Sequence, residues 1–181
     1  MMNDTISGES SMQTVLHIYP GAQRALFRKY HIGGCSSCGF QSDETLEGVC
    51  KRNGDLPVNE VLDQIKQSHE EDARILIEPA DLDKRLKNGE DIHLVDIRSR
   101  EEFEAVHIND SFLLTQPLMQ EILGSWNNDQ RFVMIDHKGQ KGLDAAAYYL
   151  GHGMPNVHAL RGGIDAWSLE VDSSIRRYSL S

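Results

Sequence analysis

The fold is organised around Val133-Met134-Ile135-Asp136-His137-Lys138-Gly139-Gln140-Lys141-Gly142. The apolar residues at its start predict a buried strand, which leads through a glycine-containing loop into a helix over Leu143 to Leu150. Such a loop directs backbone N–H groups at one point, where the helix dipole also favours negative charge. The side chain at the end of the strand is Asp136, so we expect the loop to stabilise its ionised carboxylate. The predicted anion cradle consists of Asp136, His137, Lys138, Gly139, Gln140, Lys141 and Gly142.

Strands and helices alternate on both sides of this loop. The predicted strands are Ile75 to Ile77, His93 to Ile97, Phe112 to Leu114, Arg131 to Ile135 and Asn156 to Leu160. The predicted helices are Pro79 to Leu86, Arg100 to Ala105, Met119 to Trp126 and a closing turn over Gly162 to Trp167. Such alternation is typical of an α/β domain with a parallel sheet and helices on both faces. Ligands of such sheets bind beyond the carboxyl ends of the strands, where Asp136 lies.

The first third of the chain has a different texture, typical of a small all-α domain. Apolar residues at helical spacing predict helices before and after Pro20-Gly21, a third helix with Ser42 or Asp43 as its N-cap, and a fourth after Pro57. A Cys-Ser-Ser-Cys turn lies between the second and the third. We therefore expect a disordered tail over 1–11, a helical domain over 12–66, a polar linker over 67–74, the α/β domain over 75–172 and a solvated tail over 173–181.

Composition restricts the function. A net charge of −10 without a basic run argues against binding to nucleic acid or an anionic membrane. The longest apolar runs are too short to span a membrane, and no signal peptide is visible. The three cysteines all lie in the first third and do not form a secreted disulfide framework. A reducing, cytoplasmic setting is expected.

Three motifs of the second half resemble the rhodanese-like domain. Leu94 to Ile108 resembles the family signature LxDVRxxxEYxxGHI, and Leu160 to Trp167 resembles its closing LxGGxxAW. Between them, Gly139 takes the place of the glycine in the family's active loop. The resemblance implies a rhodanese fold over about residues 75–172. In that family the loop begins with a cysteine that becomes a persulfide, in the pattern C-x-x-G-x-R-S.

This sequence departs from the family pattern at the residues that carry the chemistry. Asp136 takes the place of the cysteine, Lys141 that of the arginine and Gly142 that of the serine. A carboxylate cannot accept a sulfane sulfur, and no cysteine follows Cys50. A carboxylate could act as a phosphoryl acceptor or a general base. We favour the simpler interpretation that Asp136 satisfies the cradle as a charge surrogate, and we expect no sulfurtransferase activity from this domain alone.

Three further residues near the loop are expected to serve structure. Asp96 and Arg98 follow a predicted strand and are expected to cap loops near the site. His107 is expected to be a buried, hydrogen-bonded histidine of the fold.

The helical domain resembles the small redox modules described as hybrid-cluster-protein-associated disulfide domains. The resemblance covers about fifty residues and rests on Tyr19 to Ala22, Cys35 to Cys38 and Thr45-Leu46. Cys35 and Cys38 could form a disulfide, pass a persulfide between them, or bind zinc or an iron–sulfur cluster. Cys50 and His31 could complete a metal site, although the apolar face that carries Cys50 favours a core position. A plain structural turn is the remaining alternative.

The leading hypothesis is a non-catalytic rhodanese-like protein that binds or scaffolds in sulfur or redox metabolism, with an unidentified sulfur or redox protein as its partner. A first alternative is a sulfur carrier or sulfurtransferase that uses Cys35 and Cys38. A second is an interaction module that binds zinc or iron–sulfur, although no cofactor is certain. The pair Arg176-Arg177 is expected to be solvated.

Overall fold

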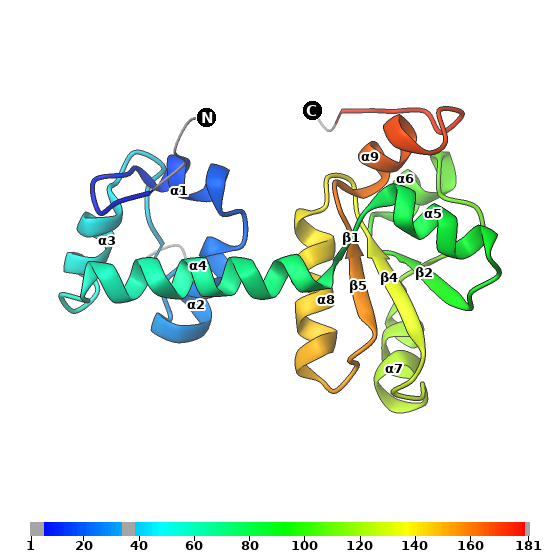
Figure 1. Cartoon of the computed structure of the whole chain (residues 1–181), viewed down its shortest axis with the longest axis horizontal. Helices are drawn as coiled ribbons and strands as arrows, with labels where there is room; N and C mark the ends of the chain where they lie inside the picture. The colour runs from blue at the N-terminus through cyan, green and yellow to red at the C-terminus, as the bar shows by residue number, and fades with distance from the viewer. Residues whose placement is uncertain (1–5, 34–38, 180–181) are drawn as a thin grey trace. The chain divides into compact units, whose positions relative to one another are not determined.

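The computed structural model describes residues 6–33 and 39–179 of the chain (Figure 1). The chain divides into two compact units, Met1–Arg74 and Ile75–Ser181. Each unit has its own hydrophobic core. Within the described part of the chain, no helix is long and apolar enough to cross a membrane.

The first unit is helical, as predicted. Its helices are α1 (Met12–Ile18), α2 (Ala22–Tyr30), α3 (Leu46–Arg52) and α4 (Val58–Ile75), the last of which crosses the boundary between the units. They enclose one apolar cluster that includes Leu26, Leu46 and Cys50. The N-cap of α3 is Thr45, whose hydroxyl accepts the Gly48 N–H. The expectation of Ser42 or Asp43 was wrong, because the backbone carbonyls of Ser42 and Glu44 instead accept N–H groups at the start of α1.

Two segments that were expected to be irregular are ordered. The predicted linker over 67–74 is helical, because α4 continues through it to Ile75. Its Ser68 and Asp72 are buried, and Asp72 forms an ion pair with Arg24 of α2, so this polar stretch has an inner face. The expectation of disorder is also wrong for residues 6–11, since Ile6 lies in the helical core.

The second unit is built on a parallel sheet of five strands in the order β1-β5-β4-β2-β3, and the predicted α/β class is confirmed. The strands are β1 (Leu76–Ile77), β2 (Ile92–Asp96), β3 (Ser111–Leu113), β4 (Arg131–Ile135) and β5 (Val157–Leu160). The helices are α5 (Pro79–Lys87), α6 (Arg100–Ala105), α7 (Gln116–Gly124), α8 (Gln140–Gly151) and α9 (Gly163–Glu170). Helix α8 begins three residues before the predicted start, directly after the loop glycine.

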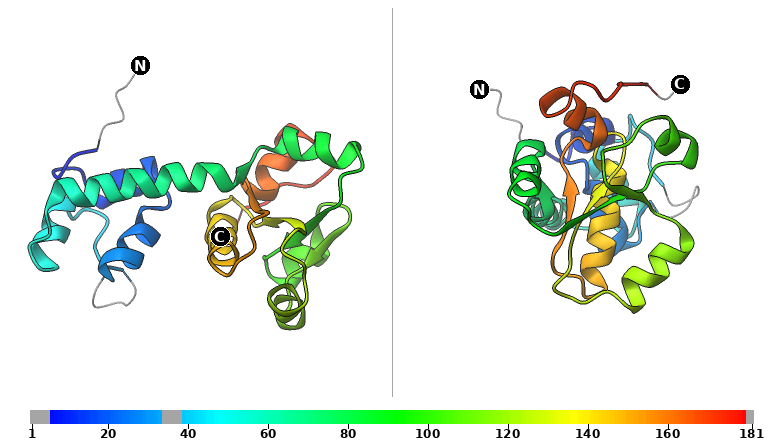
Figure 2. Two further views of the ribbon diagram at one scale, coloured as in Figure 1. Left: turned by 60° about the horizontal axis from the view of Figure 1, so that its bottom comes forward. Right: turned by 90° about the vertical axis from the view of Figure 1, so that its right-hand side faces the viewer.

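Helices cover both faces of the sheet, as Figures 1 and 2 show. Alternate residues of β4 point to opposite faces, so Phe132 and Met134 pack with residues of α7 and α8, whereas Val133 and Ile135 pack with residues of α5 and α9. The central strand β4 is therefore buried on both sides, which explains its unbroken apolar run. It ends at Ile135, so Asp136 lies at the carboxyl edge of the sheet.

Candidate functional site: the Asp136 loop

The carboxylate of Asp136 lies at the centre of the loop between β4 and α8. Its Oδ1 accepts the backbone N–H of Gly139 at 2.7 Å and its Oδ2 accepts that of Lys141 at 3.0 Å. Gly139 has φ 91°, a conformation that glycine adopts without strain, and this turn directs the loop N–H groups inward. Only 4% of the surface of Asp136 is exposed. The carboxylate therefore occupies the centre of the predicted cradle.

Burial disfavours the ionised form of this carboxyl group. The low-dielectric surroundings raise the pKa of Asp136 above its ordinary value, and this effect outweighs the backbone N–H groups of Gly139, Gly142 and Lys141, which lower it. The expectation that the N–H groups of the cradle favour the ionised form agrees with the direction of their effect, but burial disfavours that form by more. It counted the donors of the loop but not the loss of solvent around the charge, which no local pattern reveals.

The amino end of α9 packs backbone against backbone on this loop. Ile164 donates its N–H to the Asp136 carbonyl at 2.8 Å, and Asp165 donates to the His137 carbonyl at 3.2 Å. This approach requires glycine, since a Cβ on Gly163 would lie 2.4 Å from the Asp136 carbonyl oxygen. Gly162 is equally close, because a Cβ on Gly139 would lie 2.6 Å from its nitrogen. The paired glycines of the closing motif thus bring α9 against the loop.

Beside the loop, Asp96 and Arg98 form a buried ion pair. The Arg98 Nη2 lies 2.6 Å from the Asp96 Oδ2, and the two side chains are 2% and 0% exposed. Arg98 also donates from its backbone N–H to Asp96 and from Nη2 to the Val106 carbonyl at 2.8 Å. The pair ties the end of β2 to the segment after α6.

The C-terminal segment, residues 176–179, lies over the loop. The ring of Tyr178 stacks on His137 with centroids 4.3 Å apart, and the Tyr178 carbonyl lies 3.0 Å from the His137 Nε2. The Tyr178 hydroxyl accepts from the Arg98 Nη1 at 2.9 Å and donates to Glu102 at 2.6 Å. Glu102 is itself fixed, because it forms a capping box with Ser99 at the start of α6.

A shared carboxylate adds two ion pairs to this arrangement. Asp165 of α9 binds Arg177 of the C-terminal segment at 2.7 Å and Lys138 of the loop at 3.1 Å. Arg177 and Lys138 together lower the pKa of Asp165 to about 2. Arg177 is exposed, in agreement with the expectation that it is solvated, but it also pairs with a carboxylate of α9. Of the cradle residues, His137 and Lys138 thus direct their side chains to other elements, whereas Gly139, Lys141 and Gly142 present backbone N–H groups to Asp136.

The other predicted site residues lie elsewhere. His107 is exposed, and its Nδ1 lies 2.8 Å from the Phe103 carbonyl, so the expectation of a buried histidine was wrong. Burial raises the pKa of the Cys50 thiol, which is 1% exposed in the helical core. Cys35 and Cys38 lie outside the described residues. Over 6–33 and 39–179, no three His, Cys, Asp or Glu side chains gather as a metal site would require.

Three residues that contribute to the site were not predicted from the sequence: Asp165, Arg177 and Tyr178. The only local signal was an aromatic residue directly after two arginines. A hollow of about 480 Å³ lies between this tail and α6, lined by residues that include Val106 and Tyr178 but not Asp136. Chemically, the arrangement places a buried carboxylate at the end of β4. A reactive group at this position would need access to solvent or to a substrate.

Comparisons with known proteins agree with this architecture. A family model described as "Rhodanese-like domain" matches residues 78–170. A sulfurtransferase of Allochromatium vinosum is 34% identical over 92 residues, which cover 51% of this chain and 86% of that protein. The adenylyltransferase and sulfurtransferase UBA4 of Candida albicans is 29% identical over 115 residues, or 59% of this chain, and the chain spans only 26% of its length. Reduced CoADR-RHD of Bacillus anthracis is 20% identical with a TM-score of 0.50, and the match covers 67% of this chain and 21% of that one.

Proposed function

Because this chain belongs to the rhodanese-like domain family, we propose that its α/β unit is a binding or scaffold domain of sulfur metabolism that does not itself transfer sulfur. The sulfurtransferase names of its relatives support the link to sulfur metabolism. The proposal that the unit does not itself transfer sulfur rests on a single observation, the buried Asp136 carboxylate at the centre of the loop.

The chemistry of sulfur transfer explains why that carboxylate matters. A thiolate takes the sulfane sulfur from thiosulfate and releases sulfite, and the resulting persulfide passes the sulfur to cyanide and regenerates the thiolate. Asp136 offers no sulfur atom, and its oxygens already accept the Gly139 and Lys141 N–H groups. The C-terminal segment covers the neighbouring His137. The centre of the loop is thus already occupied by the Asp136 carboxylate. In this proposal, the surface around the loop recognises a partner.

A thiocyanate assay tests the proposal. The full chain, incubated with thiosulfate and cyanide, is expected to form no thiocyanate above background once Cys35 and Cys38 are replaced by serine. Asp136→Ala on that background is the matched control and should leave the result unchanged. A rhodanese that retains the loop cysteine serves as the positive control. Thiocyanate formation that survives in the double serine variant but is lost with Asp136→Ala would contradict the proposal.

A second candidate function places thiol chemistry in the helical unit. It is favoured by the burial of Cys50 in the apolar core, which removes that thiol from solvent and leaves Cys35 and Cys38 as the remaining cysteines of the sequence. In this candidate the CxxC module, similar to hybrid-cluster-protein-associated modules, accepts a sulfur from a persulfide donor, whose own thiolate is regenerated. The α/β unit then docks the sulfur or redox protein that supplies or receives the sulfur.

Mass spectrometry distinguishes this candidate from the first. After exposure to a low-molecular-weight persulfide, the peptide that contains Cys35 and Cys38 is expected to gain the mass of one sulfur, and the Cys50 peptide is not. An unmodified Cys35 peptide with both thiols titratable would rule the candidate out. Elemental analysis of protein purified without oxygen, with a visible spectrum, tests the remaining alternative of zinc or iron–sulfur at these two cysteines.

A further inference from the structure

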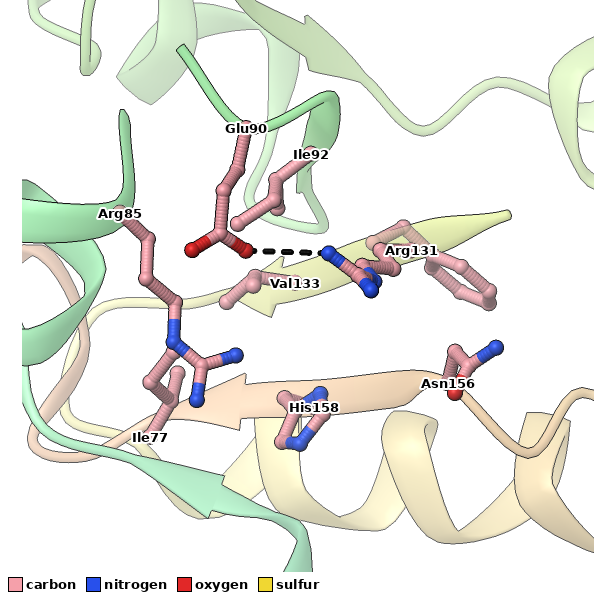
Figure 3. A pocket seen from close by; sticks show the side chains of 9 residues that line it. Ile77, Arg85, Glu90, Ile92, Arg131, Val133, Asn156 and His158 are labelled. Atoms are coloured by element: carbon pink, nitrogen blue, oxygen red, sulfur yellow. Dashed lines mark hydrogen bonds and ion pairs between the residues drawn. The ribbon is translucent and has the colours of Figure 1, made fainter. Parts of the chain in front are cut away.

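A second polar depression lies at the end of the sheet opposite to Asp136. It has a volume of about 520 Å³ and is lined by Ile77, Arg85, Glu90, Arg131, Asn156 and His158, among others (Figure 3). We call it the Arg85 pocket. Arg131 begins β4 and Asp136 follows its end, so along that strand the two features are separated by about 16 Å at roughly 3.3 Å per residue. The pocket is therefore distinct from the loop site.

The pocket lies over the face of the sheet that carries α5. Ile77, Ile92 and Val133 come from three different strands, and together they form an apolar floor on the face that carries α5. His158 of β5 points to the same face, whereas its neighbours Val157 and Ala159 pack on the other side. His158 is half-buried on this face of the sheet, next to aliphatic side chains. Such a position is more often occupied by an apolar residue than by a polar one.

Arg85 is an exposed residue of α5 that supplies a positive charge to the pocket. In Figure 3 its guanidinium extends from α5 toward His158, above the apolar floor. Arg131 pairs with Glu90 at 3.0 Å across the pocket. Within the described ranges, by contrast, the guanidinium of Arg85 has no carboxylate partner and no hydrogen bond. The charged side chains of the pocket thus sum to one positive charge, in a chain whose net charge is −10.

The surroundings of the pocket disfavour the charged form of His158. Burial lowers the pKa of His158 below its ordinary value, a hydrogen bond with the Asn156 backbone raises it in part, and the nearby positive charge of Arg85 lowers it. The charged groups that face it are Arg85 of α5, Arg131 of β4 and Glu90 of the α5–β2 connection. An arginine offers a planar fork that matches an oxyanion.

From this geometry we propose that the Arg85 pocket binds a small organic monoanion, whose carboxylate group pairs with Arg85 beside His158 and whose apolar body lies against Ile77, Ile92 and Val133. The volume suits a small molecule. One unpaired positive charge calls for one negative charge. Asn156 and the Glu90–Arg131 pair at the rim offer polar contacts to the far end of the ligand.

Benzoate is a suitable probe, because it joins a carboxylate to an apolar ring, and benzamide is its neutral control. In an NMR titration of the full chain, benzoate is expected to shift the signals of the Arg85 and His158 side chains saturably, and benzamide is not. Binding of the anion also raises the pKa of His158, which the same spectra report. A benzoate titration without saturation, or equal responses to benzoate and benzamide, would overturn the proposal.

Two variants with opposite expected signs sharpen the test. Arg85→Gln removes the unpaired charge and should weaken benzoate binding roughly tenfold or more, as the loss of a charged hydrogen bond predicts. Lys84→Gln, on the same helix but outside the lining, is the matched control and should leave the affinity unchanged. Glu90→Gln removes the negative charge of the pocket and releases Arg131, so it should strengthen binding severalfold. Weaker binding by Glu90→Gln, or no effect of Arg85→Gln, contradicts an oxyanion site.

Discussion

At the residue scale, the buried Asp96–Arg98 pair is the most consequential polar interaction of the α/β unit. Its guanidinium satisfies Asp96, the Val106 carbonyl and the Tyr178 hydroxyl at once. The removal of one partner leaves the other charge buried and unpaired. We therefore expect Asp96→Asn to lower the free energy of unfolding by about 3–5 kcal/mol, as measured by urea denaturation.

An exposed ion pair provides the matched control. Arg100 and Glu104 lie 3.8 Å apart on α6 with both side chains 66% exposed. Glu104→Gln should change the free energy of unfolding by less than about 0.5 kcal/mol, since solvent screens such pairs. Equal losses for Asp96→Asn and Glu104→Gln would show that burial does not govern these interactions.

Asp136 makes stability depend on pH in a definite direction. Its pKa is raised in the folded state, so the ionised carboxylate is disfavoured there relative to the unfolded chain. The contribution of Asp136 to stability is therefore complete below its ordinary pKa of 3.8 and is lost as the pH rises through the raised value. Consequently the stability of the wild type relative to Asp136→Asn should fall as the pH rises from about 3 to 7.

Urea denaturation of both proteins over that pH range measures this difference. An asparagine that fits the loop poorly would lower the stability of the variant by the same amount at every pH. The sign of the change in relative stability with pH therefore does not depend on that fit. Asp63→Asn, at an exposed position of α4, serves as the control. A difference that grows with pH would mean that the loop N–H groups outweigh burial after all.

At the element scale, the docking of α9 on the Asp136 loop depends on Gly163. Gly163 has φ 61°, and a Cβ there would lie 2.4 Å from the Asp136 carbonyl oxygen and 2.7 Å from the His137 carbonyl carbon and oxygen. Backbone atoms cannot move aside without breaking the Ile164 and Asp165 hydrogen bonds. Gly163→Ala is expected to destabilise the unit by roughly 3 kcal/mol or more, as strain at positive φ adds to overpacking.

Gly153→Ala separates the two effects. Gly153 also has positive φ, at 86°, but nothing lies within 4 Å of a Cβ built there. Only the conformational cost should remain, about 1–2 kcal/mol. Thermal denaturation of both variants checks the prediction, which is wrong if the two losses are equal.

The C-terminal segment lies over the loop and is held there by Tyr178 as well as by the Arg177–Asp165 ion pair. Tyr178→Phe keeps the ring on His137 but removes the hydroxyl bonds to Arg98 and Glu102. Because Arg98 and Glu102 are charged, we expect the free energy of unfolding to fall by about 1.5–3 kcal/mol.

His137 should also react faster with diethyl pyrocarbonate in a variant truncated after Ile175, since the stacked ring is then absent. Unchanged reactivity in the truncated protein would show that the segment does not shield the loop.

At the scale of the whole molecule, the division into two units predicts independent folding. Each unit has its own apolar core. We therefore expect a fragment that comprises residues 75–181 to fold by itself and to unfold in one cooperative transition, measured by circular dichroism in urea. A fragment without a cooperative transition would show that the α/β unit needs the helical one. The same experiment tests the predicted start of the α/β domain at residue 75.

Local patterns were sufficient for the α/β class. The unbroken apolar run of β4 and the two strands beside it predicted a parallel sheet covered on both faces, and the motifs around Asp96, Asp136 and Gly162 placed the loop at its carboxyl edge. The absence of a cysteine after Cys50 can be read directly from the sequence. These features are encoded by neighbours in the chain, so periodicity and spacing reveal them.

Only the tertiary structure decided the features that depend on burial and on distant contacts. Residues 67–74 look like a polar linker, yet they are helical because Ser68 and Asp72 face inward. The Asp136 pKa is raised, not lowered, because solvent is excluded by segments far along the chain. Tyr178 and Arg177 reach His137 and Asp165 across the fold, and Arg85 and His158 line one pocket although they lie 73 positions apart in the chain. Desolvation and long-range pairing are properties of the packed chain, which no single stretch of sequence contains.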